Sequence, residues 1–106
     1  MVKGKFVVTR VPGMSHEEFV SYWRDVHAPI AKKMPGLRKY NINPASEGGD
    51  GGDAPFDGIA ELSFDDQAAF DAGFGSPEGQ ATMEDAAKFI DMSKIKAVVT
   101  EEISII

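Results

Sequence analysis

One stretch of sequence decides the fold: SHEEFVSYWRDVHAPI, residues 15–30. Ser15 and Glu18 have the spacing of a capping box, so a helix is predicted to begin here. Apolar residues then recur at helical spacing, which predicts that one face of this helix packs on a sheet; they are Phe19, Tyr22, Trp23, Val26 and Ile30. Pro29 cannot donate a helical hydrogen bond, so a kink or break is predicted near His27–Ala28.

Strands and a second helix are predicted outward from this stretch. The first helix is expected to resume after the kink and reach Met34, where Pro35-Gly36 ends it. Asp65 is the predicted cap of a second helix, broken at 73–75 and restarted with Pro77 at the first helical position, running to about Ile90. The predicted strands are Lys3–Val11, Leu37–Asn43, Pro55–Phe64 and Ile95–Ile106.

This order, β-α-β-β-α-β, predicts a single α+β domain over residues 1–106. The expected architecture is ferredoxin-like, a four-stranded antiparallel sheet with the helices on one face. Several strands nevertheless carry apolar residues on both faces, so the uncovered face is predicted to meet the sheet of a second copy in a homodimer. The alternating sets are Val7, Val11, Val98 and Ile106 on one side, and Phe6, Val8, Ile95, Val99, Ile103 and Ile105 on the other.

Composition excludes several classes of function. The net charge of −6 argues against nucleic acid and anionic membranes as partners. No apolar run is long enough to span a bilayer and no signal peptide is recognised, so a cytoplasmic location is expected. The sequence has no cysteine, which excludes disulfides, thiolate zinc sites and a cysteine nucleophile. It also lacks a Gly-rich phosphate loop, and no cofactor is expected.

The segment Asn43–Ala54 is rich in Gly and Asp and has nothing to bury, so it is predicted to be a mobile loop. Calcium prefers oxygen ligands on such loops, but this one has three carboxylates and lacks the twelve-residue spacing. A solvated loop is therefore preferred to a calcium site. The two histidines do not have metal-ligand spacing, and no metal is predicted.

Two motifs resemble the EthD family. The first is Tyr22-Trp23, followed by His27-Ala28-Pro29, and the second is Pro35-Gly36-Leu37-Arg38 with Tyr40. Further similarity lies in 57–64 and 76–80, so the resemblance covers almost the whole chain. It implies a dimeric α+β barrel whose relatives include cofactor-free isomerases and polyketide-tailoring proteins.

The resemblance also implies a pocket between helices and sheet, with His27 and Tyr40 as its polar pair. Two departures from the family bear on the shape of that pocket. A strand position that is often aromatic in relatives is Ser63 here, and the Gly/Asp-rich loop is longer than usual.

The residues themselves support these candidates and offer alternatives. The imidazole of His27 titrates near neutrality and suits a general base, although it could instead cap carbonyls at the broken turn. The hydroxyl of Tyr40 could donate to a developing oxyanion, or simply lie at the sheet edge. Trp23 lies one turn before His27 and is interpreted as pocket wall and core anchor.

The remaining polar candidates are Tyr22, Glu61 and Asp57, and His16 is assigned no role. Tyr22 and Glu61 are included as substrate-binding candidates, although Tyr22 suits the core. Glu61 and Asp57 would act as acid or base only if buried, and pairing or solvation is the commoner outcome for a carboxylate. His16 follows a helix cap, and we expect it to be exposed.

Three functions remain open. The leading one is a cofactor-free enzyme of the isomerase or lyase type, which moves a proton on a small oxygenated apolar compound in catabolism or secondary metabolism. The second is a carrier of a hydrophobic metabolite. The third is an oxidoreductase that uses oxygen, with His27 as base or haem ligand; fold likeness alone does not choose among them.

Overall fold

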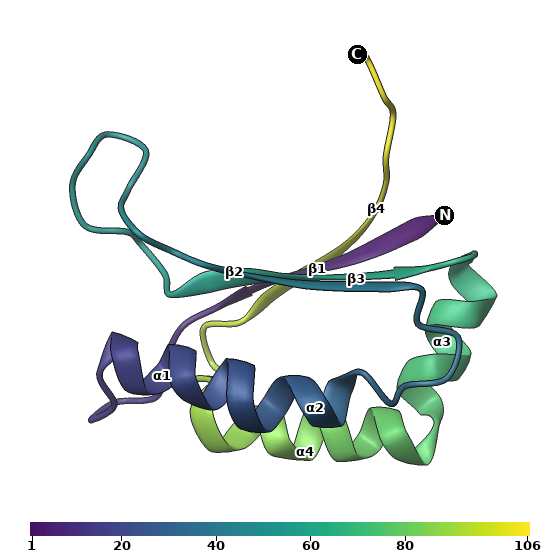
Figure 1. Ribbon diagram of the computed structural model, residues 1–106, viewed down its shortest axis with the longest axis horizontal. Coiled ribbons are helices and arrows are strands. Elements are labelled where there is room, and N and C mark those ends of the chain that lie inside the picture. The colour runs from purple at the N-terminus through teal and green to yellow at the C-terminus, as the bar shows by residue number, and fades with distance from the viewer.

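The computed structural model describes residues 1–106 and has one sheet of four strands (Figure 1). The strands are β1 (Val2–Val8), β2 (Lys39–Pro44), β3 (Gly58–Phe64) and β4 (Lys96–Glu101). They lie in the order β2-β3-β1-β4, and every neighbouring pair is antiparallel. The edge strands β2 and β4 each leave one edge without a partner in the chain.

The helical segments all lie on one side of this sheet (Figure 1). They are α1 (His16–Tyr22), the π-helical segment η1 (Trp23–His27), α2 (Ala28–Ala31), α3 (Gln67–Gly75) and α4 (Pro77–Phe89). The predicted ferredoxin-like α+β fold with a split second helix is therefore confirmed. In contrast, the β2–β3 loop and the segment after β4 rise on the side away from the helices (Figure 1).

The first helix begins as predicted but passes Pro29 in a different way. The Ser15 hydroxyl accepts from the Glu18 backbone N–H, and the Glu18 carboxylate accepts from the Ser15 N–H. Instead of a break, the chain makes one wide π turn, in which the Ala28 N–H donates to the Trp23 carbonyl. Pro29 then lies in the first turn of α2, where a missing N–H costs nothing.

Several predicted boundaries were wrong. The first strand stops at Val8, and β4 stops at Glu101 instead of Ile106. The α3 cap is Asp66, whose carboxylate accepts from the Ala69 N–H. Asp65, the predicted cap, instead pairs with Arg38 at 2.9 Å.

The core lies between the helices and the inner face of the sheet. Its largest fully buried side chains are Trp23, Phe19, Phe64 and Phe89. The outer face is more polar than the sequence pattern predicted, because Val11 and Ile106, which were expected on it, lie beyond the ends of β1 and β4. The register of the four strands places Val7, Ile59 and Val98 on the outer face. The charged and amide side chains that surround them there are Lys3, Lys5, Lys39, Asn41, Asn43, Glu61 and Lys96.

Gly58, the first residue of β3, permits a close approach of Trp23 to the sheet. A Cβ atom at this position would lie 2.6 Å from the Trp23 ring and 2.7 Å from the Asn43 carbonyl oxygen. Real Cβ atoms do not tolerate such contacts, so the ring can reach the sheet only because no side chain stands there. Trp23 is 1% exposed and cannot easily move aside.

We expect Gly58→Ala to lower the free energy of unfolding by about 1–3 kcal/mol, the usual cost of overpacking a core. Urea denaturation followed by Trp23 fluorescence measures the change. Gly75→Ala is the matched control, because a Cβ there meets nothing within 4 Å. Equal stability of the two variants would contradict the account of Gly58.

Candidate functional site

A buried hydrogen-bonded group joins the first helix to α4. The His27 ring donates from Nδ1 to Oδ2 of Asp85 at 2.8 Å, and the Tyr22 hydroxyl donates to Oδ1 at 2.7 Å. Both His27 and Asp85 are buried, and Lys88 Nζ lies 3.9 Å from Asp85 Oδ1. An ionised carboxylate only accepts, so Nδ1 carries the hydrogen and Nε2 is the basic nitrogen.

The wide turn determines where His27 stands. Trp23 and His27 open and close η1, so the π turn changes the angle between the two side chains compared with an α-helix. The His27 ring also packs on Phe89 of α4, with ring centroids 4.9 Å apart. Nδ1 and the side of the ring that meets Phe89 are thus held in place, which leaves Nε2 available to a ligand.

Burial and hydrogen bonding act in opposite directions on His27. Burial lowers the pKa of His27, and the hydrogen bond and charge of Asp85 offset this only in part. The imidazole is therefore neutral at pH 7 and able to accept a proton at Nε2. The pKa of Tyr22 is raised by its hydrogen bond to Asp85, with burial adding to the effect, so this hydroxyl remains a donor.

His27 lines an apolar cavity of about 50 Å³ between the sheet and the helices. Trp23 and Tyr40 line it too, which brings the three predicted residues together. Burial raises the pKa of Tyr40 to about 12, and the Trp23 side chain opposes this in part. Twelve of the fourteen lining residues are hydrophobic, so a polar group of a ligand would find few partners other than His27 and Tyr40.

Two other predicted residues do not line this cavity. Glu61 is on the outer sheet face, where it accepts from the Asn43 side chain and lies 4.0 Å from Lys3 and Lys5. Tyr22 reaches the site only through Asp85. Ser63, noted as a departure from the family, is also on the outer face of β3.

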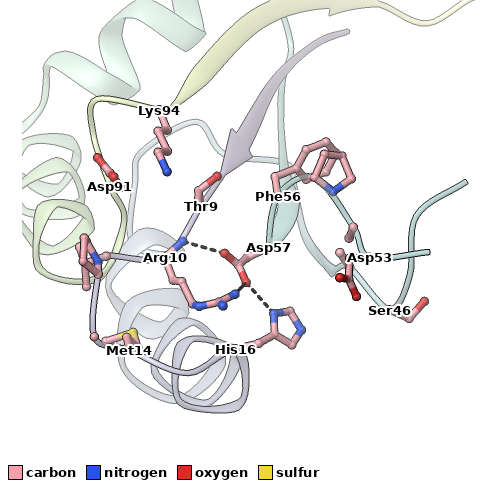
Figure 2. Close-up of a pocket in the computed structure, with 16 residues that line it drawn as sticks. Thr9, Arg10, Met14, His16, Ser46, Asp53, Phe56, Asp57, Asp91 and Lys94 are labelled. Atoms are coloured by element: carbon pink, nitrogen blue, oxygen red, sulfur yellow. Dashed lines mark hydrogen bonds and ion pairs between the residues drawn. The ribbon is translucent and has the colours of Figure 1, made fainter.

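Asp85 and a second His–Asp pair were missed by the sequence analysis. Asp85 falls on the same face of α4 as Phe89, four residues on, and this spacing was the available signal. His16 was expected to be exposed and was assigned no role, but it is only partly exposed and its Nδ1 lies 2.7 Å from Oδ1 of Asp57. Asp57 is 3% exposed and also accepts from Arg10 (Figure 2). Only the pairing of β1 with β3 brings these residues together.

The structure shows neither a cluster of metal-ligating side chains nor a membrane-spanning helix. No group of three or more His, Cys, Asp or Glu side chains is arranged to hold a metal ion. None of the helices has the length and apolar character needed to cross a membrane.

The four-stranded antiparallel sheet with its helices on one side defines an α+β protein of the ferredoxin-like class. Within that class, the chain belongs to the EthD family, since the EthD domain model matches residues 11–93. A comparison with curated proteins found no match.

Solved structures agree with this assignment. An ethyl tert-butyl ether d (EthD) family protein from Bacillus halodurans C-125 is 24% identical with a TM-score of 0.82, covering 97% of this chain and 100% of its own. A dimeric protein with a ferredoxin-like fold from Bacteroides fragilis NCTC 9343 is 15% identical with a TM-score of 0.69, covering 95% of each chain. A protein provisionally assigned as an antibiotic biosynthesis monooxygenase from Nitrosomonas europaea is 13% identical with a TM-score of 0.67, covering 98% and 100%.

The lowered pKa of His27 predicts how stability depends on pH. In the unfolded chain the pKa of His27 is about 6.5, so below that pH the unfolded chain binds more protons than the folded chain. The free energy of unfolding should therefore be highest above about pH 6.5, and fall as the pH decreases toward the pKa of the folded state. Urea denaturation between pH 7.5 and 5.5 measures this. The decline should be smaller in His27→Gln, and a wild-type stability that rises over this interval would contradict the prediction.

Proposed function

We propose that this EthD-family protein moves a proton on a small oxygenated apolar compound without a cofactor, with His27 as the base. The observation that carries the proposal is the His27–Asp85 hydrogen bond at the wall of an apolar cavity. A carboxylate on Nδ1 orients the ring, fixes its tautomer and stabilises the imidazolium that forms. A histidine serving only as a helix cap would need no such partner.

The proposed step is proton abstraction from a carbon beside a carbonyl or lactone group. Nε2 of His27 takes the proton, and the electron pair of the broken C–H bond moves toward the carbonyl oxygen to form an enolate. Return of the proton from the imidazolium to another carbon gives an isomer. Loss of a leaving group from the enolate gives elimination instead, so one base supports isomerase and lyase outcomes.

Tyr40 is the proposed donor to the enolate oxygen. With a pKa of about 12 its hydroxyl keeps its proton at neutral pH, so it donates a hydrogen bond without competing as a base. Donors aimed at developing charge have their largest effect in apolar surroundings, and the lining of this cavity is mostly hydrophobic. Trp23 forms part of the wall against which the apolar body of the ligand packs.

A second candidate is oxidation by oxygen. It is favoured by the likeness to the protein provisionally assigned as an antibiotic biosynthesis monooxygenase, a likeness of fold at 13% identity. His27 would again remove a proton, from a quinol whose anion then reacts with oxygen. Oxygen consumption with quinols, lost in His27→Gln, would favour this candidate.

The proton transfer is tested by deuterium incorporation into a panel of small unsaturated lactones and cyclic ketones incubated with the protein in D₂O. We expect exchange beside the carbonyl, with a rate lowered about 10²–10⁴-fold in His27→Gln and to a smaller extent in Tyr40→Phe. Mass spectrometry of the recovered compounds measures the exchange.

Lys32→Gln serves as the control, because Lys32 is exposed and its side chain does not line the cavity. Exchange that persists in His27→Gln would contradict the role of His27. Saturable binding of panel compounds with neither exchange nor oxygen consumption would instead identify a carrier of hydrophobic metabolites.

We also propose that the chain forms a homodimer. One structural relative is described as a dimer. In this chain Ile103, Ile105 and Ile106 follow β4 fully exposed, which is unusual for large aliphatic side chains in an isolated protein. The free edges of β2 and β4 offer unpaired backbone groups to a second copy.

Native mass spectrometry should therefore show a dimer at micromolar concentration. Truncation after Glu101 removes the three exposed isoleucines and should shift the population toward monomer. A monomeric full-length chain under the same conditions would contradict the dimer, and an unchanged dimer in the truncated chain would locate the interface elsewhere.

A further inference from the structure

A second cavity lies outside the site described above. It is an open cleft of about 720 Å³, where the turn between β1 and α1 faces the returning β2–β3 loop. It shares no lining residue with the cavity at His27. Figure 2 shows Arg10 and His16 approaching Asp57 from two directions, with Lys94 pointing into the same space.

Asp57 holds the side chains of Arg10 and His16 in place in this cleft. Its Oδ2 accepts from the Arg10 backbone N–H at 2.8 Å, and its Oδ1 accepts from the Arg10 guanidinium at 2.6 Å and from His16 Nδ1 at 2.7 Å. Burial would raise the pKa of Asp57, but these hydrogen bonds and the Arg10 charge outweigh it and lower the pKa. The carboxylate is thus ionised and fully occupied by protein donors.

The two donors that Asp57 holds still have hydrogen-bonding groups free. Arg10 uses one terminal nitrogen of its side chain and keeps Nε and the other terminal nitrogen. His16 keeps Nε2, which carries a hydrogen to donate when the ring is protonated. Their side chains are 43% and 35% exposed, whereas that of Asp57 is 4% exposed. A ligand in the cleft therefore meets oriented donors, while the negative charge that orients them lies behind them.

Charge and shape limit the class of ligand. Besides Arg10 and Lys94 the lining includes the carboxylates of Asp53, Asp57 and Asp91, so the formal charge is −1 with His16 neutral and zero with His16 protonated. Such a balance suits a monoanion better than a dianion. Met14 and Phe56 stand on the two sides of the donors and provide apolar contacts for a small organic body (Figure 2).

We propose that this cleft binds the carboxylate group of a small organic acid, with Arg10 and the protonated ring of His16 as the donors to its two oxygens. The planar guanidinium matches a carboxylate in shape, and pre-orientation by Asp57 reduces the entropy lost on binding. This site is independent of proton transfer at His27.

The test is a titration of ¹⁵N-labelled protein with sodium benzoate at pH 6, followed by NMR at constant ionic strength. We expect saturable shifts at Arg10, His16 and Met14, absent with sodium chloride and weaker with inorganic phosphate. Affinity should fall about tenfold in both Arg10→Lys, which keeps the charge opposite Asp57 but loses the planar fork, and His16→Gln.

Lys88→Gln, a surface change outside the cleft lining, should leave the affinity unchanged. His27→Gln should do the same, so failure of the function proposed for His27 and failure of this site remain distinguishable. Shifts that do not saturate, or that persist in both cleft variants, would overturn the proposal. Tighter binding of phosphate than of benzoate would overturn the choice of a monocarboxylate.

Discussion

The contact between Trp23 and Gly58 is the constraint on which the rest of the structure depends. Because Gly58 has no side chain, the indole reaches the backbone of β3 and fixes the height of the first helix above the sheet. His27, four residues on, is then set at the cavity beside the sheet. Asp57, the residue before Gly58, lies just before the start of β3 and contacts His16 at the start of α1. One close approach therefore places residues at both cavities.

Two buried aspartates have opposite surroundings. Asp85 accepts from His27 and Tyr22 in the interior, and its nearest cation, Lys88, is at 3.9 Å. Asp57 is in direct contact with a guanidinium and faces an open cleft. A buried carboxylate is costly unless its oxygens are satisfied, and both are. The two aspartates differ in the groups that they leave available to a ligand. Asp85 leaves the basic nitrogen of His27 beside an apolar cavity, whereas Asp57 leaves cationic donors beside an open cleft.

The fold was predictable from sequence because it depends on local signals, and much of the site was not. Ser15, Glu18 and Pro77 determine helix starts through neighbouring backbone groups, and these predictions hold. The placement of His27 and Tyr40 followed from family resemblance, whereas Asp85 is 58 residues from His27 and its role appears only when α4 packs against η1. Strand ends also depend on partners: alternation continues to Ile106, but the ladder with β1 ends at Glu101 because β1 begins at Val2. Local pattern does not contain that information.

The size of the inner cavity bears on how a ligand would enter. Its volume of about 50 Å³ is a third of the roughly 150 Å³ cavity that admits benzene in an engineered protein core. A cyclic substrate therefore requires side chains to move.

The deep wall of the cavity, with Trp23 1% exposed and His27 held by Asp85, is rigid. Toward the surface the lining changes to Phe74, Ile95 and Met83, and Met83 is 39% exposed. Methionine is unbranched and changes rotamer readily, so expansion at Met83 leaves the geometry of His27 and Asp85 undisturbed. A fixed histidine behind an adaptable entrance is the arrangement that the proposed proton transfer needs.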